Sequence, residues 1–290
     1  MVMIFILLYS IFSVNNLTAA KLKIDHQPLQ DYTVRKNKNK KIVKPEYIII
    51  HYTANCNQKS VINHFKKTKV SSHYIINPHG KITETIHPDN TAQHAGESSW
   101  KNNTEMNTYS IGIELINPGF TKENQEPCSS EQPELWTNQD CILLEGSPEC
   151  WYPFTKQQIS SLIALCKKLI QQYHIPTCNV LGHSDIAPGR KTDPGPLFPW
   201  KTLAEYGVGL WYNTINTTLE FSIQEIQFML QAFGYGIKIT NKLDQQTKQI
   251  ITAFQMHFRP SNIDGIPDQE TIAILYSLLN KYDKGYLDLI

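Results

Sequence analysis

The sequence predicts an α/β domain followed by a small helical domain, and three observations carry this prediction. Short runs rich in β-branched and aromatic residues lie at 47–54, 72–86 and 110–116. A long amphipathic helical pattern follows at 155–170. The chain then changes character, and residues 219–282 carry three helical patterns separated by turns that contain glycine. A length of 290 residues accommodates both parts, since one domain usually takes about 100–200 residues.

The composition is that of an ordinary globular protein. Hydrophobic residues make up 41% and charged residues 18% of the chain, which excludes a disordered chain, a coiled coil and a collagen-like fibre. The 27 Lys and Arg against 26 Asp and Glu leave a formal charge of +1. No nucleic-acid partner is predicted from so balanced a charge, and any specificity must come from a site.

The first 20 residues are typical of a signal peptide. They carry no charged side chain, and the apolar run at 1–14 is too short for a spanning helix, which needs roughly 20 apolar residues. We therefore expect an exported protein, periplasmic or secreted, and no stable membrane span, although an uncleaved N-terminal anchor stays open. Export would expose the six cysteines to an oxidising compartment, where sequence alone cannot choose among the possible pairings.

The segments around the predicted strands have different characters. Residues 21–44 are rich in Lys and Asn and predict a solvated N-terminal arm. The apolar run 110–116 has no alternation, which indicates a buried central strand. Residues 60–67 fit a short amphipathic helix, and 72–86 reads as two strands joined by a turn at 78–80.

An insertion rich in Pro and Gly occupies residues 117–153, and its role is open. It holds Cys128, Cys141 and Cys150, and we hypothesise that two of these form a disulfide. Thr155 is the expected N-cap of the helix that follows. The apolar stripe of that helix should pack on the sheet and includes Cys166, a predicted core thiol.

Residues 207–218 are predicted to form a linker to the helical module at 219–282. The expected helices of this module are 223–233, 244–258 and 268–281. Three short helices over a segment of this length predict a small independent module, which carries no candidate catalytic residue.

Three of the ten histidines lie in settings that suggest chemistry. His51 ends an apolar strand, His94 lies in the string QHAG, and His183 opens the string HSDIAPGRKTDPG. A catalytic zinc site commonly has three protein ligands and leaves a fourth position open. His51, His183 and Asp193 supply that count and would give a zinc site a net charge of +1, suited to polarising a carbonyl and acidifying a water. The spacing alone is not a zinc motif.

Five strings, in order, resemble the zinc-dependent N-acetylmuramoyl-L-alanine amidases of the amidase-2 type. They are IIIHYTA, SSHYIINPHGKI, AQHAGESSW, YSIGIELIN and GHSDIAPGRKTDPGPLFPW, and the resemblance spans residues 45–206. It implies a central mixed β-sheet flanked by helices, a fold shared with peptidoglycan recognition proteins. It also implies zinc ligands at His51, His183 and Asp193, a catalytic carboxylate at Glu114, and an oxyanion-stabilising lysine at Lys191. Asp193 and Ser72 replace the Cys and Tyr of some phage members, which favours the branch that works with Glu114.

The C-terminal strings EIQFMLQAFGYGI, DQQTKQIITAFQMHF and GIPDQET resemble the three-helix peptidoglycan-binding module of cell-wall hydrolases. The two resemblances together imply a monomer that binds peptidoglycan or muropeptides. With Zn²⁺ as cofactor, it would hydrolyse the amide between N-acetylmuramic acid and L-alanine, acting in cell-wall turnover or remodelling. His94 and Trp100 are candidate substrate-cleft residues, with local structural roles as the alternative.

Two other interpretations stay in view. A recognition protein of this fold binds muropeptides without cutting them when the metal ligands are missing, but here all three are present. In the other interpretation, His94 replaces Asp193 as the third ligand of a three-histidine zinc site.

Overall fold

The computed structural model describes residues 22–29, 32–121, 136, 140–145, 147–214 and 219–282. The predicted signal peptide at 1–20 and Cys128 lie outside these ranges. Within them, no helix combines the length and the apolar character that crossing a membrane requires.

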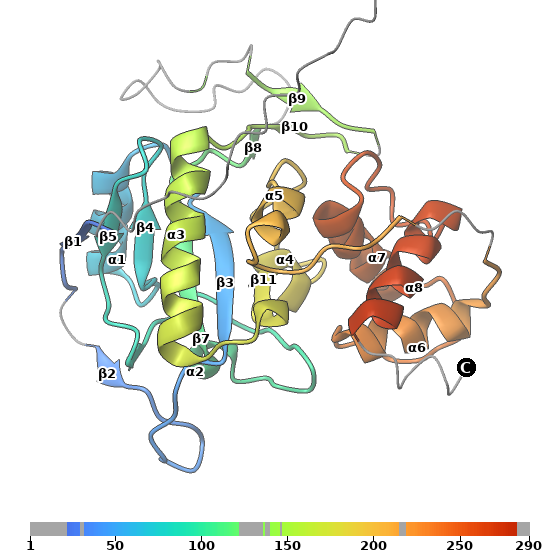
Figure 1. The fold of residues 1–290 in the computed structure, drawn as a ribbon, viewed down its shortest axis with the longest axis horizontal. Coiled ribbons are helices and arrows are strands. Elements are labelled where there is room, and N and C mark those ends of the chain that lie inside the picture. Colours follow the sequence, from blue (N-terminus) through green and yellow to red (C-terminus); the bar gives the residue numbers. More distant parts are fainter. Residues whose placement is uncertain are drawn as a thin grey trace, which may run out of the picture.

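A six-stranded mixed sheet forms the centre of the α/β domain, as predicted (Figure 1). Its order is β1-β5-β4-β7-β3-β11. Strands β4, β7, β3 and β11 run parallel to one another. Strand β5 is antiparallel to β4 and parallel to β1. Their bounds are β1 (Ile24–His26), β3 (Tyr47–Tyr52), β4 (Tyr74–Ile76), β5 (Ile82–Glu84), β7 (Ser110–Leu115) and β11 (Val180–Gly182).

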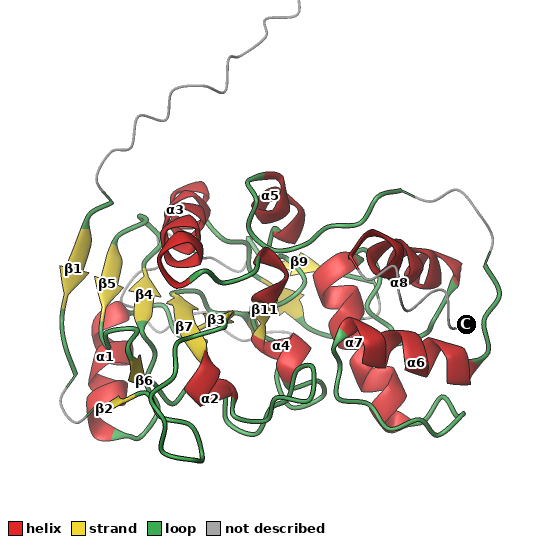
Figure 2. Ribbon diagram, turned by 60° about the horizontal axis from the view of Figure 1, so that its bottom comes forward, coloured by secondary structure: helices red, strands yellow, loops and turns green. Residues whose placement is uncertain are grey.

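Helices cover both faces of this sheet, which is why the central strands are apolar throughout (Figure 2). Ile48 and Ile50 of β3 pack with α3 (Lys156–Tyr173) in one cluster, and Ile49 points into another. Thr155 is the N-cap of α3, as predicted, since its hydroxyl accepts from the backbone N–H of Gln158 at 3.1 Å. Cys166 is fully buried on this helix, which confirms a core thiol.

The short elements complete the domain. The opposite face of the sheet carries α1 (Gln58–Lys67), α2 (Met106–Tyr109) and α4 (His183–Ile186), whereas α5 (Trp200–Glu205) lies on the side of α3 (Figure 2). A 3₁₀ turn, η1 (Thr177–Asn179), precedes β11.

The N-terminal arm differs from the solvated leader that its composition predicted. Strand β1 extends the sheet, and β2 (Thr33–Val34) pairs with β6 (Asn90–Thr91). Arg35 is 0% exposed and donates to the carbonyls of Pro88 and Thr108. The sequence shows no sign of this buried contact, because a single buried guanidinium leaves no periodic pattern in a segment rich in Lys and Asn.

The described part of the insertion has its own small antiparallel sheet. It consists of β8 (Phe120–Thr121), β10 (Cys150–Trp151) and β9 (Ile142–Leu143), in that order. Cys141 and Cys150 form a disulfide, which confirms a crosslink within the insertion. Trp151 packs so closely on Gly195 that a Cβ there would come within 2.7 Å of its ring, so the insertion supports the loop that follows Asp193.

The C-terminal module consists of α6 (Ile223–Phe233), α7 (Gln245–Phe258) and α8 (Gln269–Tyr282), close to the predicted bounds. It is not packed independently, however, because one hydrophobic cluster includes Ile49 and Trp100 of the α/β domain together with the cores of all three helices. The described part of the linker is docked as well, with Leu210 buried in that same cluster.

Candidate metal and catalytic site

The candidate site lies at the carboxyl ends of three neighbouring parallel strands. His51 and Glu114 are register partners on β3 and β7. His183 directly follows Gly182, which pairs with Ile50 one residue before His51. The carboxyl edge of an open α/β sheet is where ligands usually bind, because side chains from successive loops converge there.

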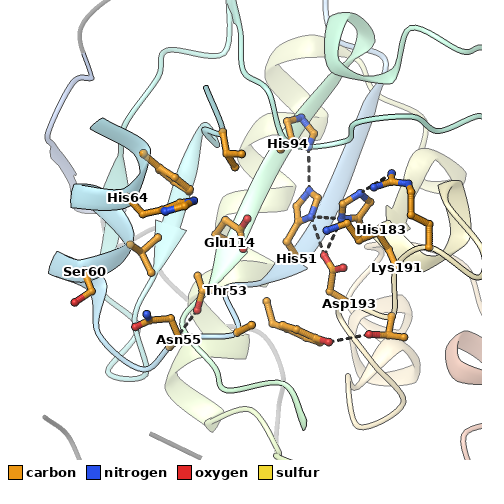
Figure 3. Close-up of a pocket in the computed structure, with 17 residues that line it drawn as sticks. His51, Thr53, Asn55, Ser60, His64, His94, Glu114, His183, Lys191 and Asp193 are labelled. Atoms are coloured by element: carbon orange, nitrogen blue, oxygen red, sulfur yellow. Dashed lines mark hydrogen bonds and ion pairs between the residues drawn. The ribbon is translucent and has the colours of Figure 1, made fainter. Parts of the chain in front are cut away.

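Three side-chain atoms converge on one point at this edge (Figure 3). His51 Nδ1 lies 3.0 Å from His183 Nδ1 and 2.9 Å from Asp193 Oδ2. The remaining pair, His183 Nδ1 and Asp193 Oδ2, is also 3.0 Å apart. All three residues are buried and form a group able to hold a metal ion.

Hydrogen bonds from the outer ring nitrogen decide which tautomer His183 adopts. Its Nε2 lies 3.0 Å from the carbonyl oxygen of Ala95, which can only accept. Nε2 therefore carries the proton and Nδ1 presents its lone pair to Asp193.

A longer chain of hydrogen bonds decides which tautomer His51 adopts. Met106 O accepts from the Ser110 hydroxyl, whose oxygen lies 3.2 Å from His94 Nε2. His94 Nδ1 is thereby left to accept from His51 Nε2, 2.9 Å away. His51 Nδ1 also presents a lone pair as a result.

Burial and neighbouring charges shift the pKa values of His51 and Asp193. Burial, together with the nearby His183, lowers the pKa of His51 to about 4, so the ring is neutral at pH 7. Burial by itself would raise the pKa of Asp193, but positive charge or a donated proton on the side of His183 and His51 lowers it below its ordinary value, and a cation held between the three groups would do the same. Two Nδ1 lone pairs and one carboxylate thus face a common point.

This donor set fits a zinc ion. Three lone pairs about 3 Å apart repel one another unless a cation lies between them. Tetrahedral zinc with bonds of about 2.0–2.1 Å places its ligand atoms roughly 3.3 Å apart, close to the separations found here.

Glu114 lies beside these donors and has an unusual environment. Its Oε2 is buried and has no hydrogen-bond partner among the described residues. Burial, reinforced by the charge of Asp193, raises the pKa of Glu114 well above its ordinary value, and the positive charge of Lys191 opposes that rise. A raised pKa of this kind suits a carboxyl that takes up and returns a proton.

A cleft of about 550 Å³ contains the site. His51, Glu114, His183, Lys191 and Asp193 all line it. Figure 3 shows Glu114 between the metal-binding group and the wall formed by α1.

Among the residues lining this cleft that sequence reasoning missed are three polar ones. His64 lines the wall from α1, and Asn55 lines it from the loop after β3. Arg190 donates to the carbonyls of Ala95 and Glu97, both at 2.6 Å, and so fixes the loop that carries His94. An exposed histidine on a short polar helix gives no sign in the sequence that it faces a cleft.

The structure separates His94 from Trp100, the two predicted substrate-cleft residues. His94 is 7% exposed at the cleft and contacts the outer nitrogen of His51, so the three-histidine alternative receives no support from its position. Trp100 is 2% exposed and packs on Tyr235 of the C-terminal module, with ring centroids 4.9 Å apart. An indole in the core between two modules does not line this cleft, and its position favours the local structural role that the sequence left as the alternative.

Comparison with known proteins gives consistent matches for both parts of the chain. Residues 41–196 match the family Amidase_2, described as N-acetylmuramoyl-L-alanine amidase. Residues 222–275 match PG_binding_1, a peptidoglycan binding domain family. The N-acetylmuramoyl-L-alanine amidase AmiD of Escherichia coli K12 is 35% identical over 251 residues, which cover 81% of this chain and 82% of the relative.

Two solved structures resemble almost the whole chain. A complex of E. coli AmiD with the substrate anhydro-N-acetylmuramic acid-L-Ala-D-gamma-Glu-L-Lys matches with a TM-score of 0.70 and 33% identity, over 86% of this chain and 93% of that one. AmpDh3 of Pseudomonas aeruginosa in complex with anhydromuramic pentapeptide matches with a TM-score of 0.68 and 31% identity, over 87% and 98%. The chain therefore belongs to the Amidase_2 family of N-acetylmuramoyl-L-alanine amidases and carries a C-terminal domain of the PG_binding_1 family.

Proposed function

We propose that this chain is a zinc-dependent amidase that cleaves the bond between N-acetylmuramic acid and the L-alanine of the stem peptide in peptidoglycan. The observation that carries the proposal is the Oε2 of Glu114, which is buried, has no hydrogen-bond partner among the described residues and lies beside three converging donor atoms. A buried carboxyl oxygen left unpaired is costly, so its retention here points to a task at this position.

His51, His183 and Asp193 are the proposed ligands of the zinc ion, which would polarise the scissile carbonyl and acidify a water molecule when bound. Glu114 takes the proton of the attacking water and passes it to the leaving amine of L-alanine. Lys191 donates to the carbonyl oxygen as negative charge develops on it; losing one such donor commonly costs about 10²–10³ in rate.

His94 is proposed as a positioning residue for His51. Its Nδ1 accepts the outer N–H of His51, which keeps the inner nitrogen deprotonated and aimed at the metal. A glycine at 112 makes this possible, because a Cβ there would come within 2.5 Å of the His94 ring. The glycine inside a central strand thus marks a close approach.

The rest of the chain suits a cell-wall substrate outside the cytoplasm. We propose that residues 219–282 bind peptidoglycan and that residues 1–20 direct export to the periplasm or the medium. N-terminal sequencing of the protein recovered from outside the cytoplasm tests the second point, with Lys21 as the expected first residue. Recovery of residues 1–20 on the mature protein would support an anchor instead.

The decisive experiment is mass spectrometry of purified muropeptides incubated with the zinc-loaded protein. Anhydro-N-acetylmuramic acid carrying a tri- or pentapeptide is a suitable first substrate, because relatives were solved with such molecules. We expect the free sugar and a peptide that begins with L-alanine. Cleavage of the glycosidic bond, or of a bond within the stem peptide, would overturn the proposal.

The control is the same reaction with Glu114→Gln, which keeps the shape of the side chain and removes its basicity. Chelation of the metal followed by addition of Zn²⁺ should abolish and then restore cleavage by the unmodified protein. Undiminished cleavage by the chelated protein would show that zinc is not required.

A further inference from the structure

Asp185 lies between the catalytic domain and the C-terminal module and is only 1% exposed. Its carboxylate accepts three hydrogen bonds. Gly182 N–H donates to Oδ2 at 2.7 Å, the Tyr235 hydroxyl donates to Oδ1 at 3.0 Å, and His257 Nδ1 lies 2.8 Å from Oδ2. Two of the three donors come from the C-terminal module. A carboxylate this deeply buried depends on such donors, because removing one leaves charge without compensation.

His257 is held for this contact by stacking. Its ring lies nearly parallel to Trp200 of α5, with centroids 3.8 Å apart and an interplanar angle of 13°. Its outer nitrogen, Nε2, is buried and has no partner among the described residues. Among the described residues, the hydrogen bond from Nδ1 to Asp185 is therefore the polar contact of this buried ring, and it links the module to the catalytic domain.

The helix that carries Asp185 also begins with the proposed zinc ligand His183. Helix α4 has only four residues, His183–Ile186, and a helix this short does not hold its shape by itself. It contacts α7 of the module. Its other anchors are Ser184 N–H to Asp193 O at 2.8 Å and the outer nitrogen of His183 on Ala95 O.

We propose that Tyr235 and His257 of the C-terminal module are positioning residues for the zinc site. Their hydrogen bonds to Asp185 fix the position of α4. Because α4 begins with His183, the position of His183 Nδ1 beside His51 and Asp193 is fixed as well. The module thus supports the metal site in addition to its proposed binding of peptidoglycan. This inference rests on the proposed function, since it assigns the module a role in that same site.

The test uses the full-length protein and four variants. His257→Leu removes the donor to Asp185, and Tyr235→Phe removes only a hydroxyl. His257→Asn keeps an N–H close to the position of Nδ1. Gln255→Leu is the matched control, because Gln255 is also fully buried on α7 but bonds Asp264, Ile266 and Thr271 within the module.

Three measurements on these variants separate positioning from mere stability. Chelator competition at pH 7 should show zinc bound about tenfold more weakly by His257→Leu, the lower end of the 10–100-fold typical of outer residues. The visible absorption of the Co²⁺-loaded protein should change in His257→Leu. Amide exchange at 184–187 should be faster in the zinc-free variant, because the Ala187 N–H bond to His183 O, 3.0 Å long, opens more often.

We expect a smaller shift of the same kind in Tyr235→Phe, recovery in His257→Asn, and none of the three changes in Gln255→Leu at temperatures where it is folded. Equal changes in Gln255→Leu, or none in His257→Leu, would overturn the proposal. If the unmodified protein bound no zinc and cut no muropeptide, the proposed function would fail, whereas the exchange measurement would still decide whether the module holds α4.

Discussion

The two proposed histidine ligands meet at one point but are supported in different ways. His51 lies on a six-residue central strand, and the chain of bonds behind it, through His94 and Ser110 to Met106, stays within the catalytic domain. His183 begins a four-residue helix whose Asp185 is held by the C-terminal module. A regular strand positions a side chain through its own ladder of hydrogen bonds, whereas a single helical turn takes its position from whatever packs on it.

Removing a proposed zinc ligand should have the largest effect on zinc retention and activity, whether the ligand is supported by the sheet or by the C-terminal module. We expect His183→Ala and Asp193→Ala each to lose zinc retention and amide hydrolysis, because two remaining donors do not make a catalytic site. Metal analysis of the purified, folded variants together with the muropeptide assay checks this. A variant that retained zinc as tightly as the unmodified protein would contradict the ligand assignment.

Glu114→Gln should separate chemistry from metal binding. The variant should hold about one zinc per chain, since a base acts beside the metal without ligating it, and kcat should fall by about 10²–10⁴. Metal content and kcat are measured on the same preparation. A kcat within a few-fold of the unmodified protein would remove Glu114 from the mechanism.

His94→Ala tests the support of His51 inside the domain. We expect the variant to retain the metal site but to bind zinc about 10–100-fold more weakly, because the outer nitrogen of His51 loses its partner. Chelator competition gives the affinity, and Ser110→Ala, one bond farther away, should lose less. Complete absence of zinc from folded His94→Ala would instead favour His94 as a ligand.

The disulfide of the insertion should matter least to the site. Cys141→Ser with Cys150→Ser opens a crosslink between residues nine apart, worth at most about 3 kcal/mol by loop entropy. We expect easier proteolysis at 140–150 and unchanged zinc affinity, since Trp151 can still pack on Gly195. Weaker zinc binding in this variant would show that the crosslink also supports the loop of Asp193.

Much of the fold was predictable from local patterns. Continuous apolar strands, the Thr155 cap and the three C-terminal helices each depend on residues close together in sequence. The N-terminal arm was not predictable, because its anchor is Arg35 donating to carbonyls more than 50 residues away. The burial of Trp100 was not predictable for the same reason, as its partner Tyr235 belongs to another module.

The sequence by itself determined the family, the candidate site residues and the presence of a second domain, because these depend on residue types in ordered strings. Only the tertiary structure decided that His51, Glu114 and His183 lie side by side, since that depends on the register of β7, β3 and β11. The tertiary structure also decided that the module and the catalytic domain share one hydrophobic cluster. Burial of Asp185 against Tyr235 and His257 joins parts of the chain 50 and 72 residues apart, and no local pattern encodes such a contact.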